Sequence, residues 1–215
     1  MIHVRAHVAA AAAAIGVLFL AHLTGAQTAS PRRSSPVRKP AAQGTTKPAT
    51  VTPTPGAGPV IVVETVKGTF EFETYPDDAP KTVAHVVNLA KRGFYNGLRV
   101  HRAVSGFVVQ MGDPQTRDMS KREWWGRGDF SGSGTPVGVA EISKKHLHVR
   151  GAVAMAHPGN PALADAQFYI TLSPQPKLDG KYSVFGRVIN GFEVLPKLQV
   201  TDILRKVYVK PSPMT

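Results

Sequence analysis

The first strongly β-forming segment of the chain reads Val60-Ile61-Val62-Val63-Glu64-Thr65-Val66-Lys67-Gly68-Thr69-Phe70-Glu71-Phe72-Glu73-Thr74-Tyr75. β-Branched and aromatic residues fill both halves, and Lys67-Gly68 between them supplies a turn, so the segment predicts a β-hairpin of residues 60–66 and 69–75. Within residues 70–73, phenylalanine alternates with glutamate. This alternation predicts one buried face and one solvent-facing face.

The pattern beyond this hairpin combines a helix with more short strands. Asp78 as N-cap, Pro80 in the first turn and valines at helical spacing predict a helix that ends at Gly93. A second short helix is expected at residues 191–198. Further strands are expected at residues 98–104, 107–111, 151–156, 167–172, 182–189 and 203–209. This pattern predicts an antiparallel sheet closed into a barrel with helices at its open ends, although a two-sheet sandwich would give a similar pattern.

The N-terminal part has the composition of an export signal followed by a linker. Residues 8–23 are almost entirely apolar and precede Thr24-Gly25-Ala26, small residues suited to signal-peptidase cleavage. We therefore expect residues 1–26 to be a signal peptide and the protein to be periplasmic or otherwise extracytoplasmic. An uncleaved membrane anchor is the alternative, although the run is short for a spanning helix of about 20 residues. Residues 27–58, rich in Pro, Thr and Ser, predict a disordered linker before a folded domain at 59–215.

Charge and composition argue against several classes of protein. The formal net charge is +12, yet residues 1–58 hold six Lys/Arg and no acidic residue, which leaves 20 basic and 14 acidic residues in 59–215. Half of the net charge thus falls outside the expected domain, so nucleic-acid binding is not predicted. A basic cell-wall-binding protein is a further alternative, and only the linker and the signal segment support it. The chain has no cysteine, and its histidines lack metal-site spacing, so we expect no metal and no cofactor.

Five blocks of sequence, in order, resemble conserved segments of one enzyme family. The blocks are Ala79-Pro80-Lys81-Thr82-Val83, Val100-His101-Arg102-Ala103-Val104-Ser105-Gly106-Phe107-Val108-Val109-Gln110-Met111-Gly112-Asp113, Gly151-Ala152-Val153-Ala154-Met155-Ala156, Gln167-Phe168-Tyr169-Ile170-Thr171 and Leu178-Asp179-Gly180-Lys181-Tyr182-Ser183-Val184-Phe185-Gly186-Arg187-Val188. They resemble the cyclophilins, a family of peptidyl-prolyl cis-trans isomerases. The resemblance covers about residues 60–209. It implies a mainly β fold, a closed eight-stranded antiparallel β-barrel capped by two α-helices.

The resemblance also implies the activity and its partners. A cyclophilin accelerates rotation about X–Pro peptide bonds, and we expect an exported member to assist the folding of exported proteins. Its partners would be proline-containing polypeptides, with no nucleic acid and no stable membrane partner if the signal is cleaved, and the barrel would act as a monomer. The alternative is a non-catalytic cyclophilin-like domain that serves as a peptide-binding chaperone or envelope scaffold.

Rotation about an X–Pro bond requires no nucleophile and no acid–base pair, because no bond breaks. The barrier of about 18–20 kcal/mol comes from amide resonance, and twisting the bond localises a lone pair on the prolyl nitrogen. A fixed cationic donor stabilises that twisted state, and Arg102 is the candidate. His101 beside it is interpreted as structural, since no base is needed.

The resemblance supplies roles for the other candidate residues. Gln110 would hold Arg102 and bond substrate backbone, and Phe107 would complete the catalytic set. The expected substrate-binding residues are Val108, Ala156, His157, Gln167, Tyr169 and Leu178. One position departs from the family pattern: Lys177 stands where many cyclophilins carry a Trp that supports cyclosporin binding.

Overall fold

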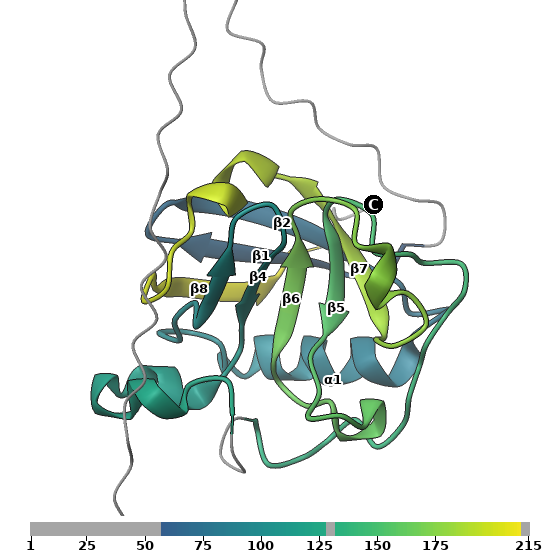
Figure 1. Cartoon of the computed structure of the whole chain (residues 1–215), viewed down its shortest axis with the longest axis horizontal. Coiled ribbons are helices and arrows are strands. Elements are labelled where there is room, and N and C mark those ends of the chain that lie inside the picture. The colour runs from purple at the N-terminus through teal and green to yellow at the C-terminus, as the bar shows by residue number, and fades with distance from the viewer. Residues whose placement is uncertain (1–56, 128–131, 212–215) are drawn as a thin grey trace, which may run out of the picture. The chain divides into compact units, whose positions relative to one another are not determined.

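The computed structural model describes residues 57–127 and 132–211 (Figure 1). The expected signal segment, and the expected linker up to residue 56, lie outside these ranges. Within them, no helix is long and apolar enough to cross a membrane. The contacts of the sheet begin at Gly58, whose backbone N–H donates to the carbonyl of Thr74 at 2.8 Å.

Eight antiparallel strands form one sheet, in the order β3-β4-β6-β5-β7-β2-β1-β8. The strands are β1 (Val60–Thr65), β2 (Gly68–Thr74), β3 (Arg102–Val104), β4 (Val108–Met111), β5 (Ala152–Met155), β6 (Phe168–Thr171), β7 (Val184–Asn190) and β8 (Leu204–Val209). The predicted hairpin is confirmed as β1 and β2. The first and last strands also pair, and past the end of β8 the N–H of Lys210 donates to the carbonyl of Val60 at 2.8 Å. The mainly β, eight-stranded antiparallel fold is therefore confirmed, and the two-sheet sandwich is wrong.

The expected full closure of the barrel is wrong. The sheet curls, but among the described strands its two edges, β3 and β8, do not form a ladder with each other. An isolated bridge between Arg99 and Ile203 crosses the seam, together with backbone bonds such as that from Val100 N–H to Asp202 O at 2.9 Å. These residues precede the two strands. In this antiparallel register the residues that follow Arg99 face residues that precede Ile203, so β3 and β8 lie on opposite sides of the bridge and cannot pair with each other.

The two ends of the curled sheet carry different kinds of helix. Helix α1 (Pro80–Lys91) is the only α-helix of the described residues and lies across one end (Figure 1). The expected second α-helix is wrong, because η5 (Phe192–Lys197) is a 3₁₀-helix. Pro196 lies inside it and has no N–H to donate, which prevents a regular α-helical turn. The remaining 3₁₀-helices are η1 (Pro114–Arg117), η2 (Met119–Trp124), η3 (Pro161–Leu163) and η4 (Pro176–Leu178).

The free backbone N–H groups at the start of α1 bond to a residue that is distant in the sequence, and not to the predicted N-cap. The structure gives no side-chain cap at the N-cap position itself, and Asp78 instead forms an ion pair with Lys145 at 2.9 Å. The two carboxylate oxygens of Glu141 accept from the backbone N–H groups of Lys81 at 2.9 Å and Thr82 at 2.8 Å. A carboxylate in this place satisfies two free donors of the first turn and suits the positive end of the helix.

Alternation along the central strands divides the apolar residues into two clusters. On β4, Val109 and Met111 belong to the main core between the sheet and α1, whereas Val108 belongs to a smaller cluster on the opposite face. On β6, Phe168 joins the main core and Tyr169 the smaller cluster. One face of these strands therefore stabilises the fold, and the other is free to build a site.

Candidate active site

Strand register places the principal candidate residues in one row. Arg102 on β3 is the direct cross-strand partner of Gln110 on β4, which is the partner of Tyr169 on β6, itself opposite Ala154 on β5. Directly opposed residues of antiparallel strands project to the same face of a sheet. The row therefore lies on the face opposite to the main core.

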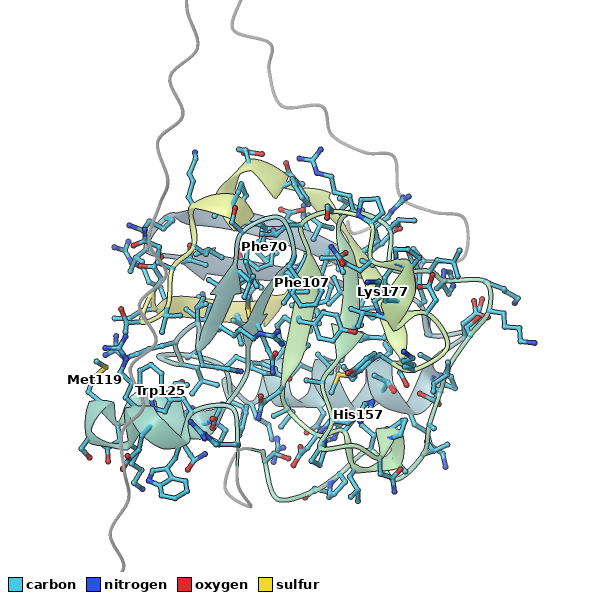
Figure 2. The ribbon with its side chains drawn as sticks, viewed as in Figure 1. Phe70, Phe107, Met119, Trp125, His157 and Lys177 are labelled. Atoms are coloured by element: carbon cyan, nitrogen blue, oxygen red, sulfur yellow. The ribbon has the colours of Figure 1, made fainter. Side chains whose placement is uncertain are left out.

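A pocket of about 310 Å³ lies over this row. Its lining residues are Arg102, Phe107, Val108, Gln110, Ala156, His157, Tyr169, Leu178 and Tyr182. Eight of these are residues that the sequence singled out, and Figure 2 labels Phe107 and His157 among them. Tyr182 was missed, although it lies inside one of the quoted blocks and its ring packs edge-on against Tyr169 at 5.5 Å between centroids.

Gln167 lies beside this pocket and not in its wall. It lines a neighbouring pocket of about 600 Å³, which shares Gln110, Ala156 and His157 with the first. The Nε2 atom of Gln110 donates to Oε1 of Gln167 at 3.0 Å. Gln167 therefore fixes the Gln110 side chain at the boundary between the two pockets.

The charge of Arg102 is available to a ligand. Its guanidinium carbon lies 5.3 Å from the centroid of the Phe107 ring, a cation–π contact that holds the side chain beside the pocket. Within residues 57–127 and 132–211, no carboxylate lies in ion-pair range of Arg102. The pocket thus combines apolar walls with one uncompensated cation.

The first backbone N–H group after β5 already has a hydrogen-bond partner within the domain. The N–H of Ala156 donates to the carbonyl of Gln167 at 2.9 Å, so this residue can offer only its carbonyl to a peptide. His157 accepts at Nδ1 from the N–H of Gly159 at 3.2 Å, and its Nε2 lies 3.0 Å from the carbonyl of Lys181. These partners correspond to the tautomer with the proton on Nε2.

His101 is placed as a structural residue. Both of its ring nitrogens are inaccessible to solvent, and the ring packs so closely on Gly126 that a Cβ there would lie 3.0 Å from Cδ2. Burial lowers the pKa of His101 to about 4. The neutral ring is therefore part of the fold at neutral pH.

This burial predicts a pH dependence of stability. The unfolded chain takes up a proton on His101 near the ordinary pKa of about 6.5, whereas the folded chain does so only near 4. Stability from the neutral ring is thus present above pH 6.5 and is lost as the pH falls toward 4. We expect the free energy of unfolding to fall by about 2 kcal/mol between pH 7 and pH 5 through this residue.

Urea unfolding of the protein and of His101→Gln at both pH values measures this loss. The carboxylates with lowered pKa values titrate below this window, and the other histidines are shared by both proteins. The variant should lose about 2 kcal/mol less than the parent. Equal losses in the two proteins would show that His101 accepts a proton in the folded state.

Comparisons with known proteins agree with this geometry. The family model for the cyclophilin type peptidyl-prolyl cis-trans isomerases matches residues 60–214. A peptidyl-prolyl cis-trans isomerase of Arabidopsis thaliana is 40% identical over 144 residues, which are 66% of this chain and 82% of that protein. Peptidyl-prolyl cis-trans isomerase B of Bacillus subtilis is 39% identical over 140 residues, which are 65% of this chain and 90% of that protein.

A solved structure is similar over the same part of the chain. It is a cyclophilin type peptidyl-prolyl cis-trans isomerase of Cryptosporidium parvum, determined in the presence of the dipeptide Ala-Pro, with a TM-score of 0.62 and 27% identity. The similarity covers 71% of this chain and 99% of that one. Motifs, curled sheet and relatives thus lead to one assignment: the chain belongs to the cyclophilin family and is a peptidyl-prolyl cis-trans isomerase.

Proposed function

We propose that this isomerase acts outside the cytoplasm, where it accelerates X–Pro rotation in exported polypeptides as they fold. The support for the location is the sequence of residues 1–26, with its apolar run and small residues at the end. Residues 27–58 would then act as a spacer that carries the catalytic domain, residues 59–215. The protein would work as a monomer on proline-containing polypeptides.

The observation that carries the proposed mechanism is the row of Arg102, Gln110 and Tyr169 beneath the 310 Å³ pocket. The proline ring of the substrate would enter between Phe107 and Leu178, with Tyr169 as the inner wall. This placement brings the prolyl nitrogen toward Arg102 on the edge strand β3. Gln110, fixed by Gln167, would bond the substrate backbone.

Catalysis in this arrangement is preferential binding of the twisted amide. In either planar isomer the nitrogen lone pair is delocalised and accepts poorly, whereas in the twisted state it accepts a hydrogen bond from the guanidinium. The apolar part of the wall, at Phe107, Val108 and Leu178, lowers the local polarity and strengthens that interaction. Because no bond breaks, the residues of the pocket suffice for the reaction.

An isomerase assay tests the proposed pocket. Exchange NMR on an Ala-Pro peptide, with the purified chain at micromolar concentration, should show cis–trans exchange far faster than the tens of seconds of the uncatalysed reaction. A tetrapeptide with Ala in place of Pro is the control for nonspecific binding. Binding of the proline peptide without faster exchange would favour a non-catalytic peptide-binding chaperone.

Export predicts a shortened mature chain. When the full-length sequence is expressed in a bacterium with a periplasm, we expect the protein in the periplasmic fraction with its N-terminus at Gln27. N-terminal sequencing and intact mass measure this. A charged substitution in the apolar run, Leu18→Arg, should keep the precursor in the cytoplasm. Intact Met1 in the membrane fraction would show that the segment is an anchor.

A further inference from the structure

Behind the wall of the pocket, a buried histidine connects Tyr169 to an aspartate. The Nε2 atom of His148 lies 2.9 Å from the hydroxyl of Tyr169, and its Nδ1 lies 2.8 Å from Oδ1 of Asp179. The His148 and Tyr169 rings are nearly parallel, with an interplanar angle of 12°. His148 is only 2% exposed. The proposed mechanism gives this histidine no role, although it touches a residue of the pocket.

The direction of each hydrogen bond follows from the partners. Asp179 also accepts from the backbone N–H of His148 at 2.8 Å, and these bonds, the backbone one first, hold the pKa of Asp179 below its usual value. A charged carboxylate only accepts, so Nδ1 of His148 carries a proton, and in the neutral ring Nε2 then presents its lone pair. Burial raises the pKa of Tyr169, so its hydroxyl remains protonated. In that tautomer the hydroxyl donates to Nε2.

This hydroxyl needs its acceptor because of where the ring lies. Tyr169 is 5% exposed and belongs to the small apolar cluster that walls the pocket. A buried hydroxyl that loses its partner must turn toward apolar atoms or draw in water, and either is costly. The bond to His148 directs the polar end of Tyr169 away from the substrate and leaves the ring as the wall.

The backbone of His148 also holds the loop on the other side of the pocket. Its carbonyl accepts from the N–H of Gln175 at 2.7 Å, and Gln175 Nε2 donates to the carbonyl of Gly106, next to Phe107, at 3.2 Å. Asp179 directly follows Leu178 in the pocket wall. One residue thus organises the ring and the loop that flank the expected proline site.

We propose that His148 and Asp179 are positioning residues of this isomerase, which hold the Tyr169 ring in place as a wall of the proline pocket through its hydroxyl. The proposal rests on the proposed function of the pocket, because it assigns the wall a substrate. The effect of the His148 side chain on the Tyr169 ring passes through one atom, the Tyr169 hydroxyl, whereas its effect on the loop passes through Asp179. Removing the hydroxyl must therefore remove the part of the effect that acts on the ring.

A double-mutant cycle tests this dependence. His148→Leu should lower kcat/KM for a proline peptide by about 5–50-fold, mainly through a higher KM, since a buried donor loses its partner. The same substitution in a Tyr169→Phe background, compared with Tyr169→Phe itself, should cost several-fold less, because no hydroxyl is left unsatisfied and only the bond to Asp179 is lost. His148→Gln, which keeps an acceptor near the position of Nε2, should recover part of the loss.

Controls separate positioning from general damage. His146 lies on the same segment, pairs with Asp78 at 2.8 Å and does not line the 310 Å³ pocket, so His146→Leu should leave kcat/KM unchanged. Thermal unfolding monitors the fold of each variant. If His148→Leu does not fold, His148→Asn, which keeps a donor for Asp179 but is too short to reach the Tyr169 hydroxyl, and its Tyr169→Phe double variant carry the cycle instead.

Different outcomes would overturn the positioning role of His148 and the proposed function of the pocket. Equal losses from His148→Leu in both backgrounds would overturn the positioning role and leave the isomerase intact. An inactive parent would overturn the proposed pocket function instead. In either case, ¹⁵N NMR of the imidazole reads the bonds directly: a proton on Nδ1, with Nε2 shifting when Tyr169→Phe is introduced, supports the arrangement. A proton on Nε2 in the folded protein would contradict it.

Discussion

Arg102→Ala is expected to lower kcat/KM for a proline peptide by about 10²–10³-fold, the usual effect of removing one preorganised donor from a transition state. The loss should appear mainly in kcat, because the twisted amide, and not the planar substrate, is the better acceptor. The fold should remain, since Arg102 is an exposed residue at the edge of the sheet. Exchange NMR measures the rate, and thermal unfolding measures the stability.

Two further variants sharpen the interpretation. Arg102→Lys should recover little activity, because a compact ammonium cannot match the planar fork of a guanidinium. Arg205→Ala removes an exposed arginine on β8 that does not line the pocket, and it should leave the rate unchanged. Near-normal turnover by a folded Arg102→Ala variant would refute the assignment of the donor.

The second large effect concerns cyclosporin. Lys177 is exposed on η4 and directly precedes Leu178 of the pocket wall (Figure 2). A lysine offers a flexible stem and a strongly hydrated charge to an apolar macrocycle, whereas an indole offers a flat apolar face and one N–H donor. We therefore expect an active enzyme that cyclosporin inhibits weakly, and Lys177→Trp should lower the inhibition constant by about 10–100-fold.

Inhibition titrations on the two proteins decide this prediction. Lys67→Trp, in the exposed turn between β1 and β2, adds the same indole elsewhere and should change nothing. Tight inhibition of the unmodified enzyme would show that residue 177 does not contribute to the drug site. If neither protein is inhibited, Val108 and His157 become the residues to exchange next.

Much of the fold was predictable because its signals are local. The alternation in residues 70–73 correctly predicted the buried side of β2, because Phe70 and Phe72 lie in the main core. The predicted solvent-facing side is wrong at Glu73, which is fully buried and pairs with Arg187 on the neighbouring strand β7 at 3.3 Å. The 3₁₀ character of η5 could also have been expected, since Pro196 stands in its sequence. The partial opening of the sheet could not, because it depends on the register in which the segment around Arg99 meets Ile203, two segments about 100 positions apart.

The candidate site was also predictable only where its signals are local in the sequence. The motif around Arg102 named the residues of the pocket, and the register of β3, β4 and β6 then brought them together. What the sequence could not reveal are contacts between residues far apart in the chain. Glu141 reaches the start of α1 across about 60 positions, and His148 meets Asp179 across 31.

The pairing of β1 with β8 makes this domain suitable for circular permutation. The N–H of Lys210 bonds the carbonyl of Val60, so a short Gly/Ser bridge could join the two ends without spanning the molecule. New termini could open at the exposed Lys67, in the turn between β1 and β2. In such a protein β8 and β1 would become a local hairpin. The strands that carry the pocket would keep their order in space.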